Sequence, residues 1–175
     1  FAAFDGYHDA KTIEGYENAL FRKSKRVTAS AKGLVARAEA TGARAELVPN
    51  GVELSLFRPE TVARPIDKPP GARVFGFIGA IYEWIDLAWI EALARSRPQD
   101  VVVMVGPLKA AVAAEAKRLE SVSNIRFIGP VPHKEVASWV AAFNACLLPF
   151  KRNRLTESVN PLKLYEYCAL GKPCL

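Results

Sequence analysis

Apolar and polar positions alternate in a regular way through the second half of the chain, from residue 73 onward. Short apolar runs of strand length are separated by segments whose apolar residues recur every three or four positions, as in amphipathic helices. The predicted strands cover residues 74–78, 101–105, 125–128 and 145–148, and the predicted helices cover residues 86–95, 109–119 and 133–143. Strands joined by single helices imply right-handed crossovers. We therefore predict an α/β fold: a Rossmann-like parallel sheet with helices on both faces.

The first part of the chain carries a similar alternation in shorter elements. Residues 1–6 have the pattern of the end of a strand. The further elements predicted there are helices over residues 10–24 and 31–40 and strands over residues 25–29 and 44–48. Asp9 and Ser30 precede the two helices, and both residue types are favoured at the N-cap.

A proline-rich, charged stretch over residues 59–72 separates the two patterns, and its composition is typical of an interdomain linker. We therefore place the last part of an N-terminal Rossmann-like domain at residues 1–58 and an incomplete C-terminal domain at residues 73–175. The chain begins within one strand and stops as another begins, so we expect a fold truncated at both ends.

Strand, loop and helix signals meet in residues 145–175. After the strand and a basic loop, Asn160 is the predicted N-cap of a helix whose first residue is Pro161, and residues 173–175 would begin another strand. Loops at the carboxyl ends of parallel strands bind ligands in such folds, and a helix N-terminus favours phosphate. Lys163 and Glu166 lie on one face of this helix, suited to a phosphorylated sugar or nucleotide. A solvated i,i+3 ion pair is the alternative.

Two segments of this chain resemble known signatures. SVNPLKLYEYCALGKPC, at residues 158–174, resembles the donor-site block of bacterial family-1/4-type GT-B glycosyltransferases, and PNGVELSLFRP, at residues 49–59, resembles the segment that leaves their N-terminal domain. The resemblance implies an acceptor-side domain followed by a nucleotide-sugar donor domain. It also implies that Glu166 binds the ribose hydroxyls and that the helix start receives the pyrophosphate, at Asn160, Pro161, Leu162 and Lys163.

The chain departs from this family pattern at several positions. Ser158 stands where many relatives carry a second glutamate near the sugar. The loop that begins at Gly79 has the sequence GAIYEW and lacks the Arg and Lys that hold the diphosphate in many relatives. We expect basic residues elsewhere to compensate, namely Lys151, Arg152, Arg154 and Lys163. The resemblance places His133 beside the nucleobase, and an exposed residue near a helix start is the alternative.

Composition and charge narrow the class of protein. The chain has 175 residues, half of them hydrophobic, and a formal net charge of +6, which permits phosphate-bearing, nucleic-acid or membrane partners. No apolar run has the length of a membrane helix, and no signal peptide opens the chain. Three cysteines without a C-x-x-C pair predict buried thiols in a reducing compartment. No G-x-G-x-x-G occurs, which argues against a dinucleotide oxidoreductase.

These observations lead to one function and two rivals. We predict a glycosyltransferase that lies in the cytoplasm or at the inner face of the membrane. It moves a sugar from a nucleoside-diphosphate sugar to an unidentified acceptor, which is a glycan, a lipid-linked sugar or a small molecule. No cofactor, metal ion or nucleic-acid partner is expected, and the catalytic residue stays unassigned. The rivals are a nucleotide-sugar epimerase of the same architecture and a noncatalytic, basic nucleic-acid-binding domain.

Overall fold

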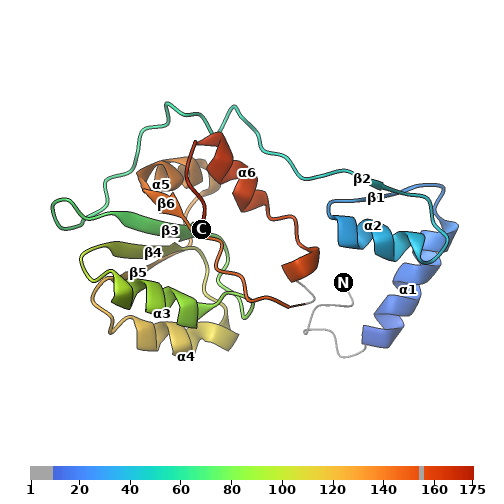
Figure 1. Ribbon diagram of the computed structural model, residues 1–175, viewed down its shortest axis with the longest axis horizontal. Coiled ribbons are helices and arrows are strands. Elements are labelled where there is room, and N and C mark those ends of the chain that lie inside the picture. Colours follow the sequence, from blue (N-terminus) through green and yellow to red (C-terminus); the bar gives the residue numbers. More distant parts are fainter. Residues whose placement is uncertain (1–9, 154–155) are drawn as a thin grey trace. The chain divides into compact units, whose positions relative to one another are not determined.

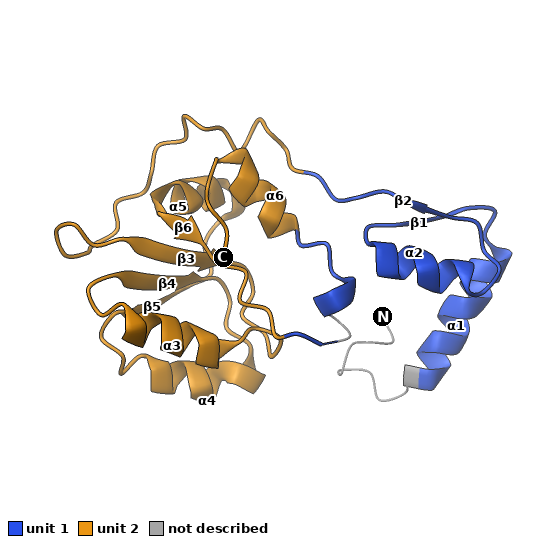
Figure 2. Ribbon diagram, viewed as in Figure 1, with its two compact units in different colours: residues 1–51, 152–161 blue, residues 52–151, 162–175 orange. Residues whose placement is uncertain are grey.

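The structure is a computed structural model that describes residues 10–153 and 156–175. The chain forms two compact units (Figure 2): unit 1 comprises residues 1–51 and 152–161, and unit 2 comprises residues 52–151 and 162–175. The stretch predicted as a linker, residues 59–72, belongs to unit 2. The assignment of acceptor-side and donor-side domains stays a prediction.

Unit 2 is built on a four-stranded sheet in which every paired strand is parallel (Figure 1). Its strands lie in the order β5-β4-β3-β6 and comprise β3 Val74–Ile78, β4 Val101–Val105, β5 Ile125–Gly129 and β6 Ala145–Cys146. All residues of β3 and β4 are buried, which explains why these strands are continuous apolar runs. The backbones of Cys146 and Cys174 also form a parallel β-bridge, so the segment at Cys174 extends the sheet beyond β6, as predicted.

Helices cover both faces of this sheet (Figure 1). On one face lie α3 Leu87–Ser96 and α4 Ala110–Leu119, and on the other lie α5 Val136–Ala142, preceded by the 3-10 turn η1 His133–Glu135, and α6 Leu162–Ala169. Asp86 caps α3, because its Oδ1 atom accepts a hydrogen bond from the backbone N–H of Trp89 at 2.9 Å. The predicted α/β fold is therefore confirmed.

Unit 1 contains a pair of parallel strands, β1 Val27–Ala29 and β2 Ala45–Leu47. Its helical elements are α1 Ala10–Lys23, α2 Lys32–Glu39 and the 3-10 turn η2 Thr156–Ser158. The prediction that Ser30 caps α2 is wrong: the N-cap is Ala31, which has no side-chain oxygen and makes no side-chain cap bond. The strand predicted at residues 1–6 and the cap at Asp9 lie outside the described residues.

The cysteines differ from one another in exposure, and all three are free thiols. Cys146 is buried in the sheet, and burial raises the pKa of its thiol to about 12, so it stays protonated and unreactive. Cys174 is partly buried. Cys168 is exposed, so the prediction of a buried thiol is wrong at this position. It lies one helical turn after the exposed Leu164, on the outward face of α6.

No helix among residues 10–153 and 156–175 has both the length and the apolar character needed to cross a membrane.

Candidate functional site

Two loops at the carboxyl edge of the sheet in unit 2 are joined through their backbones. They follow β3 and β4, respectively. The N–H of Ile81 donates to the carbonyl of Pro107 at 2.9 Å, and the N–H of Lys109 donates to the carbonyl of Ile81 at 3.1 Å. A third loop, which follows β6, joins the first, because the N–H of Lys151 donates to the carbonyl of Trp84 at 2.8 Å. The first loop is therefore held from both sides.

Gly106 allows the first two loops to approach each other. It has a φ of 137°, and a Cβ atom at this position would lie 2.0 Å from the carbonyl oxygen of Gly79. No side chain fits at that distance, so only glycine permits the contact. The result is a close backbone contact directly after β3, with Gly79 partly exposed and Gly106 buried, at the edge where ligands bind in open α/β sheets.

Helix α6 places two charged side chains beside this backbone. Lys163 lies against Gly79, since its Cε atom is 3.8 Å from the position of a Cβ atom there. Lys163 Nζ donates to Glu166 Oε2 at 2.8 Å, and the side chains of Lys163 and Glu166 are 25% and 11% exposed. The pair is thus mostly withdrawn from solvent, unlike the solvated pair of the alternative interpretation. The other carboxylate oxygen, Oε1, accepts no hydrogen bond from the described residues.

Other predicted site residues belong to unit 1 and are held there by long-range contacts. The Asn160 side-chain amide donates to the carbonyl of Ser30 at 2.8 Å, and the Asn50 amide donates to the carbonyl of Asn160 at 2.6 Å. Helix α6 begins at Leu162, one residue after the predicted start, so Pro161 and not Asn160 directly precedes the helix. Ser158 ends η2, where its Oγ lies close to Gly33 of α2.

The remaining predicted residues are distributed as follows. Leu162 is the first residue of α6 and is exposed. Arg152 is exposed in unit 1, and Arg154 lies outside the described residues. His133 is exposed at the start of η1, as the alternative interpretation held, and its ring meets the edge of Phe57 with centroids 6.5 Å apart.

Sequence reasoning missed a cation beside the first loop. Lys109 Nζ lies 5.0 Å from the centroid of the Tyr82 ring, and Tyr82 stacks on Trp84 with centroids 4.1 Å apart. An ammonium group over an aromatic face is attracted by the ring quadrupole. The sequence did hold a signal, namely the position of Lys109. It lies three residues after Gly106, which directly follows β4, in the loop next to the one that lacks Arg and Lys.

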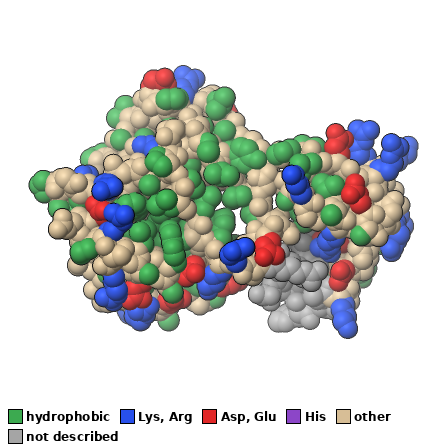
Figure 3. All heavy atoms as spheres, viewed as in Figure 1, with side chains coloured by type: hydrophobic (Ala, Val, Ile, Leu, Met, Phe, Trp, Pro, Cys, Tyr) green, Lys and Arg blue, Asp and Glu red, His purple; other side chains and the backbone are tan. Residues whose placement is uncertain are grey.

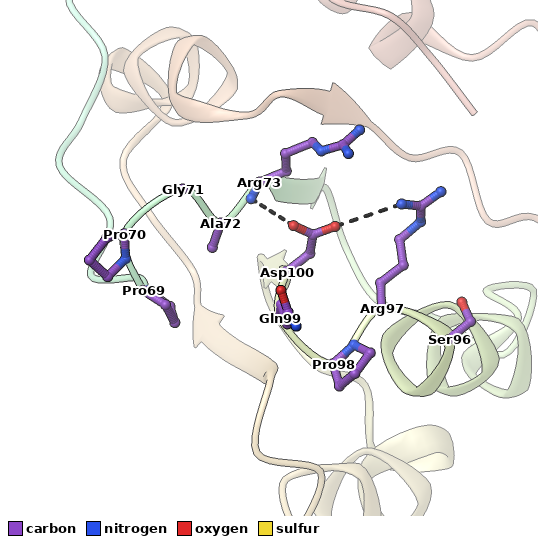
Figure 4. Close-up of a pocket in the computed structure, with 10 residues that line it drawn as sticks. All are labelled: Pro69, Pro70, Gly71, Ala72, Arg73, Ser96, Arg97, Pro98, Gln99 and Asp100. Carbon is purple, nitrogen blue, oxygen red and sulfur yellow. Dashed lines mark hydrogen bonds and ion pairs between the residues drawn. The ribbon is translucent and has the colours of Figure 1, made fainter.

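A cleft of about 760 Å³ lies at the opposite, amino edge of the same sheet (Figure 4). Its centre is Asp100, whose carboxylate accepts a hydrogen bond from the backbone N–H of Arg73 at 2.8 Å and lies 3.8 Å from the guanidinium of Arg97. These contacts tie the start of β3 to the turn before β4. Ligands of such sheets bind at the carboxyl edge, so we do not assign the donor site to this cleft.

No group of three or more His, Cys, Asp or Glu side chains is arranged to hold a metal ion in the described part of the chain.

The comparison with protein families decides which family this is. The model that describes glycosyl transferases group 1 matches residues 72–175, which is more than half of the chain. The chain belongs to this family. The matched residues include Gly79, the β4 loop and all of α6, so the site described above lies within the family's shared part.

Three similar proteins agree with this family membership. A Bacillus subtilis (strain 168) protein named as a teichuronic acid biosynthesis glycosyltransferase, TuaH, is 29% identical over 169 residues, which cover 93% of this chain and 43% of that protein. A sucrose-phosphate synthase structure from Thermosynechococcus elongatus matches with a TM-score of 0.74 and 20% identity over 97% of this chain and 45% of that chain. Anabaena HepE in complex with UDP and glucose matches with a TM-score of 0.66 and 18% identity over 93% of this chain and 47% of that chain.

The structural likeness confirms the predicted GT-B fold class. In each of the three matches, this chain spans less than half the length of the similar protein.

Proposed function

We propose that the protein carrying this chain is a glycosyltransferase that takes its sugar from a nucleoside diphosphate, and that unit 2 binds this donor. The observation that carries the proposal is that Lys163 lies against the partly exposed Gly79 and pairs with Glu166, at the carboxyl edge of a parallel sheet. The HepE complex, which holds UDP and glucose in a protein of similar fold, supports the same ligand class.

Each charged residue of α6 has a separate part in the proposal. The Lys163 ammonium group donates to the diphosphate, because a cation beside backbone N–H groups attracts phosphate oxygens. The Glu166 carboxylate accepts hydrogen bonds from the vicinal hydroxyls of the ribose, for which its Oε1 atom is available. In the absence of donor the two side chains neutralise each other, which lowers the cost of holding two charges in a mostly buried place.

Charge on the leaving diphosphate is stabilised by lysines and backbone N–H groups, without a metal ion or cofactor. We add Lys109 to the predicted cations, because its backbone is hydrogen-bonded to the same loop that lacks Arg and Lys. Arg152 and Arg154 stay predicted as further cations, Asn160, Pro161 and Leu162 stay predicted as residues that receive the pyrophosphate, and Ser158 stays predicted near the sugar. His133 keeps its proposed place beside the nucleobase.

The side of unit 2 where α3 and α4 lie does not have the charge pattern of a nucleic-acid-binding surface. Figure 3 shows acidic and basic side chains interspersed along the side of unit 2 where α3 and α4 lie. Glu91, for example, pairs with both Arg95 and Arg118 there. A surface that binds the phosphates of a nucleic acid carries a continuous basic stripe instead.

The decisive experiment is a binding and turnover assay on the intact protein. We expect wild type to bind one of UDP, GDP, ADP, CDP or dTDP and to release that diphosphate from its sugar when an acceptor extract is added. An epimerase would instead return an intact, isomerised nucleotide sugar. Loss of the sugar to an acceptor with no isomerised donor supports transfer, and binding of none of the five diphosphates contradicts the proposal.

Glu166→Ala tests how the donor is held. Two charge-assisted hydrogen bonds of roughly 1.5 kcal/mol each predict about a hundred-fold weaker binding of the natural diphosphate. The 2′,3′-dideoxy analogue should bind Glu166→Ala about as well as it binds wild type, because it has no hydroxyls for the carboxylate to bind. Glu135→Ala, which removes a carboxylate on η1 that pairs with Arg64, is the matched control and should leave affinity unchanged. Equal losses for both ligands would show that Glu166 does not bind ribose.

A further inference from the structure

The ladder between β3 and β6 is short, and the sequence of the strand explains why. Phe75 pairs with Ala145 and Gly76 pairs with Cys146, and the N–H of Leu147 donates to the carbonyl of Gly76 at 2.8 Å. In a parallel ladder the next rung has two hydrogen bonds: the N–H of Ile78 would donate to the carbonyl of Leu147, and the N–H of residue 149 would donate to the carbonyl of Ile78. Residue 149 is proline and has no N–H, so the ladder cannot continue.

A side chain takes the place of the missing rung. The backbone N–H of Ile78, which points toward β6, donates to the hydroxyl oxygen of Tyr167 at 3.2 Å. At the other end of β3 a side-chain oxygen again accepts a backbone N–H, because the N–H of Val74 donates to Asn144 Oδ1 at 2.8 Å. The two side chains thus satisfy the polar backbone of a buried strand where its neighbour cannot.

Tyr167 joins the strand end to the helix that carries the charged pair. Its side chain is 0% exposed, and burial raises the pKa of its hydroxyl well above the usual range, so the group stays neutral. Tyr167 follows Glu166 directly and lies one helical turn after Lys163, while Ile78 directly precedes Gly79. A single hydrogen bond therefore connects the backbone edge with the turn of α6 that faces it.

We propose that Tyr167 is a positioning residue for the donor: by replacing the missing β3–β6 rung, its hydroxyl sets the place of Lys163 and Glu166 relative to Gly79. This inference rests on the donor site proposed above. Tyr167 itself is buried and touches no ligand. Its hydroxyl acts through the two α6 side chains, so its removal should weaken binding of the ribose and of the diphosphate together.

The first experiment tests the hydrogen bond without any ligand. Tyr167→Phe keeps the ring and its packing but removes the acceptor of the Ile78 N–H. With isoleucine selectively labelled by ¹⁵N in the intact protein, we expect the Ile78 amide of the variant to exchange with solvent at least ten-fold faster. Ile90, which is buried in α3 on the other face of the sheet, should be unchanged. Unchanged exchange at Ile78 would overturn the proposal.

The second experiment tests the effect on donor binding. Tyr167→Phe should weaken binding of the diphosphate that wild type prefers by about ten-fold. Leu170→Ala is the matched control, because it removes a buried side chain directly after the same helix and leaves the hydroxyl in place. It should lower the melting temperature more than Tyr167→Phe does and weaken binding less. If the loss of affinity follows the loss of stability across both variants, the role is only structural.

A double-mutant cycle separates this inference from the proposed function. If Tyr167 acts through Glu166, Tyr167→Phe should weaken binding much less in a Glu166→Ala background than in wild type. If Tyr167→Phe binds the diphosphate as tightly as wild type does, the positioning role is overturned and the donor site stands. If wild type binds no diphosphate, both are overturned.

A measurement on wild type covers the case in which the variant fails to fold. Added diphosphate should shift the Ile78 amide resonance more than that of Ile90, and equal shifts contradict the proposal.

Discussion

The two edges of the unit 2 sheet are built from the same strands and differ in what they expose. At the amino edge, a cleft of about 760 Å³ is lined by side chains whose polar groups bind one another through Asp100. At the carboxyl edge, Gly79 and Gly106 bring two loops together with no side chain between them, Lys163 lies against Gly79, and Glu166 pairs with Lys163. The amino edge joins parts of the fold, and the carboxyl edge holds a partly withdrawn ion pair.

This difference shows why the volume of a cleft is a poor guide to a site in this fold. Parallel strands direct their free carboxyl ends, the following loops and the N-termini of the next helices to one edge only. The opposite edge holds the turns that return the chain, and its charges serve to fasten them. Substitutions at each edge test this contrast.

Gly106→Ala should have the largest effect. The new Cβ atom would lie 2.0 Å from the carbonyl oxygen of Gly79 at a φ of 137°, so the loops must separate. We expect the free energy of unfolding, measured by urea denaturation, to fall by about 3 kcal/mol or more. Gly71→Ala, at the amino edge, is the control: its φ is 79° but no atom lies within 4 Å of the new Cβ atom, so about 1 kcal/mol is expected. Equal losses would show that the approach of the two loops is not the cause.

Lys163→Ala should weaken binding of a nucleoside diphosphate by about ten-fold or more, since a charge-assisted hydrogen bond contributes roughly 1.5–3 kcal/mol. Binding of the corresponding nucleoside should change little, because it has no phosphate. Arg97→Ala removes a cation at the amino edge and should leave both affinities as they are. Calorimetry with the two ligands gives the comparison, and a loss shared equally by nucleoside and diphosphate would contradict the role of Lys163.

Asp100→Ala should affect stability and leave donor binding unchanged. Its carboxylate is 14% exposed and accepts the backbone N–H of Arg73, so its removal should lower the free energy of unfolding by about 1 kcal/mol. Donor affinity should stay within two-fold of wild type, as a rough limit. A variant with normal stability and weakened donor binding would reverse the assignment of the two edges.

Lys109→Ala should have the smallest effect, because the residue is exposed and its contact with Tyr82 is a weak one. We expect diphosphate binding to weaken roughly two- to five-fold at low salt and the difference to shrink as salt is added. Lys117, exposed near the other end of α4, provides the matched control, and Lys117→Ala should have no effect. If both variants weaken binding alike, the change reflects net charge and not a local contact.

The regular strands and helices of unit 2 were predictable because their causes are local. The apolar runs that became β3 and β4 needed only burial on both faces. The placement of Lys163 and Glu166 on one face of α6 followed from helical spacing. The family resemblance of residues 158–174 was visible in the letters themselves.

The caps predicted at Ser30 and Asn160 were wrong for the opposite reason. The amide of Asn160 donates to the carbonyl of Ser30, a residue distant in the chain, and no local pattern can reveal such a contact or fix a helix start to within one residue. The same holds for Lys109 and Tyr82, which meet because the β3 and β4 loops are neighbours in the sheet. The exposure of Cys168 depended on which face of α6 packs inward.

The sequence alone determined the types and order of the elements, because hydrophobic period and chain direction act within a few residues. The tertiary structure decided which backbone groups lacked a partner and which side chains supplied one. Pro149, which interrupts the β3–β6 ladder, is visible in the sequence, but the Ile78 N–H beyond the last rung belongs to another strand, and the hydroxyl that accepts it belongs to Tyr167 of a helix. A buried backbone N–H needs an acceptor, and only the folded chain brings the three segments together.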